Sequence, residues 1–381
     1  MRVLIVGGGV AGLTLAAKLR QQGREPVVVE QAEEYGEHGY SLGLYPFGSS
    51  VLHGLGAHGE LAERGMEMRT YELADHTGGV ISTADLSEAL AEFGPSYVTT
   101  HADLVQILRG ACGDAEIRMG TTVTRLDQGE DAVRVTFSGG AEESFDVVCG
   151  CDGIHSQVRE MAFGTQPEFE TGWVGWTWWG SEGIFPAKTV REHWLRGTFF
   201  GTYPVPGKST FVAAVPKEKI PPDADLGEDE VLARLRRDFG GLAEASPEVG
   251  KALAEAHDLW PWPLADVRSG ELRSGRIALC GDAGIAFLPT AGIGASTAMR
   301  SAAALGDELS RADAQLVPLA LEHYAERITP TAHKNQSDSR HLAKVMFVEN
   351  RLASWGREEL LKHMPAASTT KQLAEMMRRP M

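Results

Sequence analysis

The hydrophobic positions at the start of the chain predict a buried strand, a glycine turn, a helix and a second strand. MRVLIVGGGVAGLTLAAKLRQQG (1–23) supplies the first three segments, and PVVVEQ (26–31) supplies the second strand. Continuous apolar runs of this length are typical of parallel strands that are covered on both faces. Together these segments predict one βαβ unit.

The rest of the chain mixes helical and strand patterns, and its character changes near residue 165. From about 165 to 220, segments such as GTFFGTYPV and STFVAAVP alternate in a way that predicts an antiparallel sheet. The last sixty or so residues have amphipathic helical spacing. The other expected elements are helices over 49–65, 100–111 (capped by Thr99 or Thr100), 228–239, 248–257 and 294–312, strands within 116–140, and buried strands at 145–153 and 275–284.

These elements predict an α/β fold with two domains and a helical end. The first is a Rossmann-like domain with a βαβ unit and a parallel sheet, expected over 1–165 and 270–312. It makes an excursion into the second domain near 66–100. The second, mainly antiparallel-sheet domain is expected over 166–269, and C-terminal helices over 313–381.

The composition argues against several classes of function. The chain has 36 Lys and Arg against 52 Asp and Glu, a net charge of −16. This argues against nucleic acid and against a polybasic membrane anchor, because both need clustered cations. No apolar run approaches the roughly 18 residues of a membrane span. Four cysteines without metal-ligand spacing predict reduced core thiols in a cytoplasmic protein and no metal site.

The first candidate site is the glycine turn GGGVAG between the first strand and the first helix. Glycine lets the backbone turn tightly and approach a pyrophosphate, whose charge the free N–H groups of the helix N-terminus bind. An acid ends the next strand, where it can accept both hydroxyls of an adenosine ribose. The motif comprises Gly7, Gly9, Val10, Ala11, Gly12 and Glu30.

Two later turns also combine glycine with an acid. CDGIHSQVRE begins at Cys151, and GDAGIAFLPTAGIGAS runs from Gly281 into the helix over 294–312. In the second of these, a carboxylate can accept a ribityl hydroxyl, and N–H groups at the helix start can face a phosphate or a ring edge. The residues are Asp152, Gly153, Ser156 and Arg159 in one turn and Gly281, Asp282, Pro289, Gly292, Ile293, Gly294, Ala295 and Ser296 in the other.

In this order, the three motifs resemble those of FAD-dependent monooxygenases of the aromatic-hydroxylase type, which have a p-hydroxybenzoate-hydroxylase-like fold. The resemblance covers about residues 1–312 and implies FAD and NAD(P)H as cofactors. It assigns the first motif to the ADP half of FAD and the second to both FAD and the nicotinamide cofactor. It assigns Gly281 and Asp282 to the ribityl chain, and Pro289 and 292–296 to the isoalloxazine ring.

Departures from the family pattern indicate a divergent subgroup. Many members place an Arg on the pyrophosphate, yet no Lys or Arg lies between Arg24 and Arg64. Other neighbours of the cofactor implied by the resemblance are Ser41, Leu42, His101 and Leu104. The family often has Gly, Arg, His, Asn and Asp where this chain has Ser41, His101, Ile285, Ser296 and Ser301.

The chemistry that the resemblance implies belongs mainly to the cofactor. Reduced flavin reacts with O2 to a flavin hydroperoxide, which passes an OH group to an electron-rich substrate, while the protein orients the substrate and excludes water. A phenolic substrate would gain from a base. The candidates are Tyr45, His53, His193 and Tyr203, and the sequence assigns none of them.

The stretch GWVGWTWWG (172–180) holds four of the eight tryptophans. Two-residue alternation places Trp176 and Trp178 on one face of a strand and Trp179 on the other. They either pack between sheet and helices or line an apolar pocket for an aromatic or polycyclic molecule. On the second interpretation, the substrate residues are Trp176, Trp178, Tyr203 and Phe211.

The expected reaction is hydroxylation of such a molecule with NAD(P)H and O2. Two alternatives stay open: a reductase or dehydrogenase of the geranylgeranyl-reductase kind, and a protein that keeps FAD as a scaffold for a non-redox cyclisation. A flavin-dependent halogenase is disfavoured, because no lysine occurs between Lys18 and Lys188 to hold the chlorinating species. The expected partners are a small molecule and O2, not nucleic acid, and the oligomeric state stays open.

Overall fold

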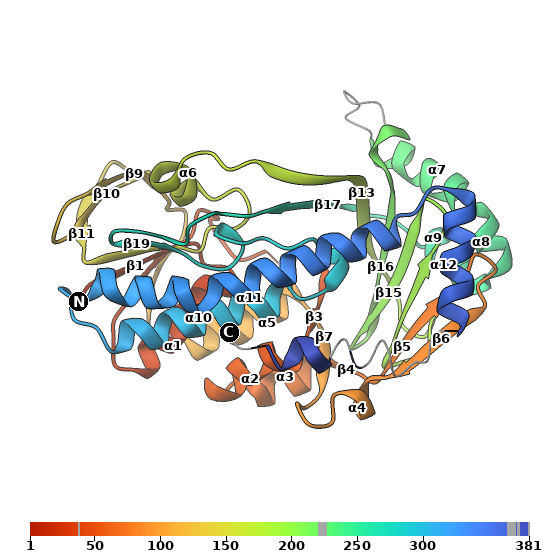
Figure 1. Ribbon diagram of the computed structural model, residues 1–381, viewed down its shortest axis with the longest axis horizontal. Coiled ribbons are helices and arrows are strands. Elements are labelled where there is room, and N and C mark those ends of the chain that lie inside the picture. The colour runs from red at the N-terminus through yellow and green to blue at the C-terminus, as the bar shows by residue number, and fades with distance from the viewer. Residues whose placement is uncertain (37–38, 220–226, 364–370, 372–373, 380–381) are drawn as a thin grey trace.

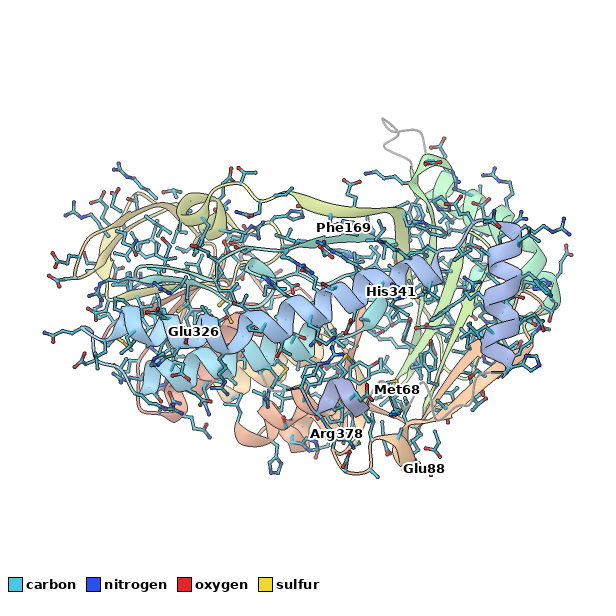
Figure 2. All side chains as sticks on the ribbon, viewed as in Figure 1. Met68, Glu88, Phe169, Glu326, His341 and Arg378 are labelled. Atoms are coloured by element: carbon cyan, nitrogen blue, oxygen red, sulfur yellow. The ribbon has the colours of Figure 1, made fainter. Side chains whose placement is uncertain are left out.

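A computed structural model of the chain describes residues 1–36, 39–219, 227–363, 371 and 374–379. The molecule is elongated, with a parallel sheet at one end and an antiparallel sheet at the other (Figure 1). The long helix α11 (Val317–Met346) passes from one to the other, and Figure 2 labels Glu326 and His341 along this passage. The α/β fold predicted from the sequence is confirmed.

The parallel sheet has the strand order β18-β19-β12-β1-β2-β8. All pairings are parallel except that of β18 at the edge. The two sides of β1 are covered, so all four of its apolar residues are buried, as the continuous apolar run predicts. The strands are β1 (Val3–Val6), β2 (Val27–Val29), β8 (Glu116–Arg118), β12 (Val147–Gly150), β18 (Arg273–Ser274) and β19 (Ile277–Leu279).

Helices and a small sheet surround the parallel sheet. α1 packs against both α5 and α10, and a three-stranded sheet of β9, β10 and β11 lies beside α6. These elements are α1 (Val10–Gln21), α5 (His101–Ala111), α6 (Gln157–Phe163), α10 (Gly294–Ser310), β9 (Val123–Gln128), β10 (Val133–Phe137) and β11 (Glu142–Phe145).

The second sheet has seven strands in the order β17-β13-β16-β15-β14-β5-β6 and is antiparallel except for the pair β14–β5. Its outer face is packed with α7, α8 and α9 (Figure 1). The elements are β5 (Thr70–Ala74), β6 (Val80–Asp85), β13 (Glu168–Ser181), β14 (Thr189–Trp194), β15 (Phe199–Val205), β16 (Lys208–Pro216), β17 (Trp260–Val267), α7 (Glu228–Asp238), α8 (Gly240–Ala245) and α9 (Pro247–Ala254).

A third small sheet, β3-β7-β4, and short helices complete the described chain. The single helix expected over 49–65 is two helices, α2 and α3, because the chain turns at Gly56 with φ of 76°. The remaining elements are β3 (Ser41–Leu44), β4 (Met66–Met68), β7 (Ser96–Thr100), α2 (Pro46–Gly54), α3 (His58–Arg64), α4 (Leu86–Ala89), α12 (Arg351–His363) and the 3₁₀ turns η1 (Lys217–Lys219), η2 (Gly281–Ala283) and η3 (Pro289–Ala291).

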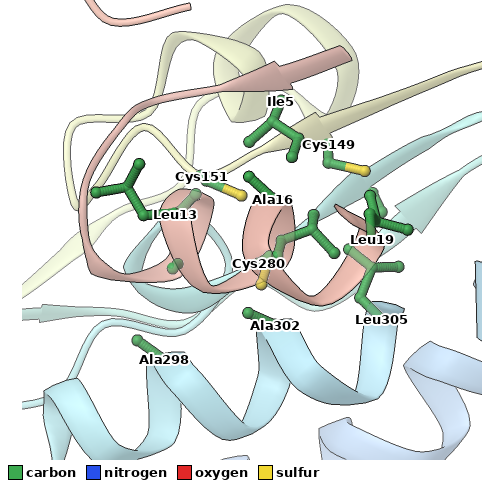
Figure 3. Close-up of a cluster of buried hydrophobic side chains, with 14 of the residues drawn as sticks. Ile5, Leu13, Ala16, Leu19, Cys149, Cys151, Cys280, Ala298, Ala302 and Leu305 are labelled. Atoms are coloured by element: carbon green, nitrogen blue, oxygen red, sulfur yellow. The ribbon is translucent and has the colours of Figure 1, made fainter. Parts of the chain in front are cut away.

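The cysteines lie in the core and form no disulfide among the described residues. Cys149, Cys151 and Cys280 pack between β1 and the helices α1 and α10 (Figure 3). The Cys280 Sγ lies 3.3 Å from the Ser301 Oγ. Within the described ranges, no helix has the length and apolarity needed to cross a membrane.

Candidate cofactor and substrate site

The three glycine-acid turns meet at one edge of the parallel sheet. They follow β1, β12 and β19, which are parallel neighbours and therefore end on the same side. The contact is close: a Cβ on Gly7 would lie 2.4 Å from the Cys151 carbonyl oxygen, and one on Gly281 would lie 2.8 Å from the Ala11 Cβ. Only glycine fits at these two positions, where φ is also positive.

The first turn leaves the N-terminus of α1 uncapped. Gly9 is its N-cap residue, has extended backbone geometry and makes no side-chain cap hydrogen bond. A Cβ on Gly9 would meet nothing within 4 Å, so the N–H groups of Val10 and Ala11 border open space. The Glu30 carboxylate accepts from the Gly8 N–H at 2.7 Å and from the Ala32 N–H at 2.9 Å. Each of its oxygens keeps a lone pair for a ribose hydroxyl.

The second turn is held by its own side chains. The Ser156 hydroxyl donates to Asp152 Oδ1 at 2.6 Å. It also accepts from the Arg159 N–H and thereby caps the N-terminus of α6. Arg159 is 6% exposed, and its guanidinium donates to the carbonyls of Ala283 and Ile154. These residues therefore fasten the second turn to the third, and Gly153 leaves open space at its φ of 77°.

The third turn presents a carboxylate without a protein partner. Asp282 lies deep in the molecule, and burial raises its pKa to about 6. The residue nevertheless keeps exposed surface, and its carboxylate accepts no hydrogen bond within the described residues, so it is free to accept one from a ligand. Gly292 adopts a left-handed φ of 62°, and a Cβ on Gly294, the first residue of α10, would meet nothing within 4 Å.

The remaining residues of this loop have different surroundings. Pro289 begins η3, Ala295 is half-buried, and Ile293 is buried in the core. The Ser296 hydroxyl is fully buried and accepts from the Tyr45 N–H at 3.0 Å. Ser296 thus joins the loop to the start of α2.

His101 and its neighbours form the side of the site near α5. The His101 N–H donates to the Tyr40 carbonyl, and the two rings lie 5.5 Å apart. Burial lowers the pKa of His101, so the ring is neutral near pH 7. Ser41 and Leu42 pair with β7, whereas Leu104 is fully buried in the core and supports α5 from within.

These features fit a dinucleotide of the FAD type. The two uncapped helix starts, α1 and α10, offer N–H groups to a pyrophosphate and to a ring edge. The Cβ positions of Gly9, Gly153 and Gly294 are open, and the accessible carboxylate of Asp282 is free to accept hydroxyl groups.

The substrate assignment of three aromatic residues needs correction. Trp176, Trp178 and Phe211 share one face of the seven-stranded sheet, as alternation predicts, but α7, α8 and α9 cover that face. The Trp178 Nε1 donates to the Ala252 carbonyl on α9 at 3.0 Å. This packing conflicts with a substrate role. The prediction failed because alternation in the sequence defines which residues share a face of the strand but not which elements cover that face.

Tyr203, the fourth predicted residue, lies on the opposite, inner face. There it packs with Tyr45, Tyr71 and Trp179 over a small buried cluster. Of the other candidate bases, His53 is exposed, and His193 is fully buried on the outer face, where burial lowers its pKa.

The inner face carries a buried acid that sequence reasoning missed. Glu192 is 8% exposed, and its carboxylate accepts from the Tyr71 hydroxyl at 2.7 Å, the Tyr203 hydroxyl at 2.8 Å and the Trp194 Nε1 at 2.8 Å. The available sequence signal was the position of Glu192 between Arg191 and His193. Two-residue alternation along the strand directs its side chain to the face opposite to theirs.

Tyr45 connects this acid to the loop after η3. A Cβ on Gly292 would lie 3.8 Å from the Tyr45 hydroxyl, and burial together with Glu192 raises the pKa of Tyr45 to about 12. A cavity of about 380 Å³ is lined by Trp179 and Val205, and Val205 belongs to the buried cluster on which Tyr45 packs. Its other lining residues include Tyr40, Arg64, Thr100 and Lys208.

Asp282→Asn is expected to raise the melting temperature of the cofactor-free protein at pH 8 more than at pH 5. The folded chain keeps the Asp282 proton up to about pH 6, whereas an unfolded Asp loses it near pH 3.9. The contribution of the protonated acid to the free energy of unfolding is therefore complete below about pH 4 and is lost as the pH rises to 6. Asparagine is uncharged at every pH, so it relieves a penalty that wild type has mainly at high pH. An equal effect at both pH values would contradict the desolvation of this carboxylate.

Comparison with known proteins agrees with this geometry. Residues 1–339 match the family model described as "FAD binding domain". The chain is 31% identical to 3-amino-4-hydroxybenzoate 2-monooxygenase of Streptomyces cremeus over 319 residues, 80% of this chain and 77% of the relative. It is 28% identical to aurachin C monooxygenase/isomerase of Stigmatella aurantiaca, over 96% of this chain and 94% of the relative.

Among solved structures, Klebsiella pneumoniae HpxO complexed with FAD and uric acid has the same fold. It superposes with a TM-score of 0.91 over 99% of this chain and 96% of that one, at 23% sequence identity.

Proposed function

Because the chain belongs to the FAD-binding-domain family of class A flavin monooxygenases, with FAD as cofactor, we propose that it hydroxylates an aromatic or polycyclic small molecule with NAD(P)H and O2. NAD(P)H is the reductant typical of the hydroxylases in this family. The observation that carries the proposal is the position of Tyr45. A Cβ on Gly292 would lie 3.8 Å from its hydroxyl, and Tyr45 packs on the same buried cluster as Tyr71 and Tyr203 of the inner face.

The residues around the turns hold and orient FAD. The first turns of α1 and α10 donate N–H groups, while Glu30 and Asp282 accept hydroxyl groups. The Asp152, Ser156 and Arg159 side chains act by fixing the turn that joins them to Asp282. Once reduced, bound FAD supplies the activated oxygen that enters the substrate ring.

The inner face of the seven-stranded sheet binds the substrate. Tyr45, Tyr71 and Tyr203 are each only partly buried by the protein. Flat aromatic walls suit a flat ring, and their apolar surroundings exclude water from the reacting atoms. Two relatives support a planar ring substrate. One is the 3-amino-4-hydroxybenzoate 2-monooxygenase, and the other is an FAD-dependent urate hydroxylase of Klebsiella pneumoniae, and both names refer to planar ring compounds.

The test is substrate-dependent incorporation of oxygen. FAD-loaded protein is incubated with NADPH or NADH, ¹⁸O₂ and a panel of aminophenols, hydroxybenzoates, hydroxypyridines and quinolones. We expect one member to accelerate NAD(P)H consumption and to gain one ¹⁸O atom by mass spectrometry. Reduction of a double bond without ¹⁸O would favour a reductase, and a product that forms without NAD(P)H would favour a scaffold role for FAD.

A further inference from the structure

The carboxylate of Glu192 is buried without a cationic partner. It projects from β14 on the inner face, between Tyr71 on β5 and Tyr203 on β15. No salt bridge among the described residues includes Glu192, and its two oxygens are satisfied by two phenols and one indole. A buried charge without a counter-ion is costly, so packing alone does not explain an acid at this position.

The hydrogen bonds fix the direction in which the two phenols can interact. A carboxylate only accepts, so Tyr71 and Tyr203 must direct their O–H hydrogens at Glu192. Their oxygens therefore offer only lone pairs to a ligand on the inner face. The subsite made by Glu192, Tyr71 and Tyr203 accepts hydrogen bonds and carries negative charge.

The neighbouring groups preserve this polarity. Burial and Glu192 raise the pKa of both Tyr71 and Tyr203 well above the ordinary value, so both stay protonated donors. Burial also raises the pKa of Glu192 itself, but three donors favour its charged form. Tyr45 is the other titratable group beside it, and its hydroxyl makes no hydrogen bond within the described part of the chain.

We propose that this subsite selects substrates by their hydrogen-bond donors. On the proposed function, it takes an aromatic ring that directs an amino, ring N–H or phenolic O–H group at Tyr71 and Tyr203, and it rejects a ring carboxylate. Glu192 is a positioning residue that orients the two phenols, which contact the substrate. A carboxylate here would face the lone pairs of two phenols and a like charge in a water-poor site.

Calorimetric titration with a matched ligand pair tests the proposal. The probes are 2-aminophenol and 3-amino-4-hydroxybenzoate, which differ only by a carboxylate, and the protein is FAD-loaded without NAD(P)H under argon. We expect 2-aminophenol to bind about 100-fold more tightly. Equal affinity, a preference for the carboxylate or no binding of 2-aminophenol would overturn the subsite.

Glu192→Gln removes the charge and frees one of the two phenols to donate to a ligand, because the amide keeps a single acceptor oxygen and donates from its NH2 group. It is expected to reduce the preference to about tenfold or less. The control is Glu72→Gln, which removes the partner of Arg191 on the outer face of the same sheet and should leave the preference unchanged. If Glu192 only held the strands together, Glu192→Gln would change the stability of the protein but not the ratio of its affinities for the two ligands.

Tyr71→Phe and Tyr203→Phe keep the test decisive if Glu192→Gln does not fold. Each deletes one acceptor oxygen and should weaken 2-aminophenol about tenfold, without improving the binding of the carboxylate. Wild-type affinity in both variants would overturn the proposal. Binding is measured without turnover, so this outcome is separate from a failure to detect hydroxylation. If 3-amino-4-hydroxybenzoate were the preferred substrate and gained ¹⁸O, the proposed subsite would be refuted while the proposed hydroxylase function would stand.

Discussion

Gly12→Ala is expected to lower the free energy of unfolding by about 3 kcal/mol, with or without FAD. A Cβ at position 12 would lie 1.9 Å from the Gly7 carbonyl oxygen and 3.2 Å from the Ile5 Cγ2. The first of these atoms belongs to the backbone, so no side-chain rotation relieves the clash. Alanine gains about 1 kcal/mol of helix propensity over glycine, which is too little to compensate. Urea unfolding measures the difference.

Gly9→Ala separates cofactor binding from folding. Its φ of −81° and ψ of −164° suit alanine, and the new Cβ would meet nothing within 4 Å. We expect the unfolding free energy of the FAD-free protein to change by less than about 0.5 kcal/mol. The affinity for FAD should fall about 100-fold, because the methyl group would occupy the space in front of the uncapped α1 N-terminus.

Gly110→Ala is the matched control for both substitutions. Gly110 lies near the C-terminal end of α5 and belongs to none of the three turns, and a Cβ there would also meet nothing within 4 Å. It should keep or raise stability and leave FAD binding unchanged. Normal FAD affinity in Gly9→Ala would place the pyrophosphate elsewhere, and normal stability in Gly12→Ala would contradict the tight Gly7–Gly12 contact.

Local patterns in the sequence were sufficient for much of the fold. The apolar run before Gly7 is a strand buried on both sides, and the Thr100 hydroxyl accepts from the Asp103 N–H at the start of α5, as expected for its cap. Pairing between distant segments has no local signature. The parallel pairing of Tyr71 with Val190, which brings β5 beside β14, depends on two strands that are more than a hundred residues apart.

The same division applies to the site. The sequence marks Gly7, Gly281 and Asp282 as candidates through local turn chemistry and charge, and the structure brings their turns together at one edge of the sheet. Glu192 was missed because its significance arises only where Tyr71 and Tyr203 reach it from neighbouring strands. Alternation predicted which tryptophans share a face, but the helices that cover this face follow later in the chain.

Trp178→Ala is expected to lower the free energy of unfolding by about 4 kcal/mol. The side chain is 1% exposed, lies 5.8 Å from the Phe211 ring centroid and 6.0 Å from that of Phe200, and donates to the Ala252 carbonyl. The substitution leaves a large cavity beneath α9 and an unpaired buried carbonyl. Chemical unfolding of the FAD-free protein measures this loss.

Ligand affinity distinguishes this core role from the substrate role that the tryptophan-rich stretch suggested. The folded Trp178→Ala protein should bind 2-aminophenol as the wild type does, because Trp178 faces α9 and Tyr203 faces the opposite side. Trp260→Ala is the control for loss of an indole, since Trp260 is 49% exposed and should cost less than about 0.5 kcal/mol. If Trp178→Ala bound the ligand more weakly but kept the wild-type free energy of unfolding, Trp178 would belong to the substrate site. Truncation of a core residue lowers the stability of the protein, and unchanged stability would therefore exclude the core role.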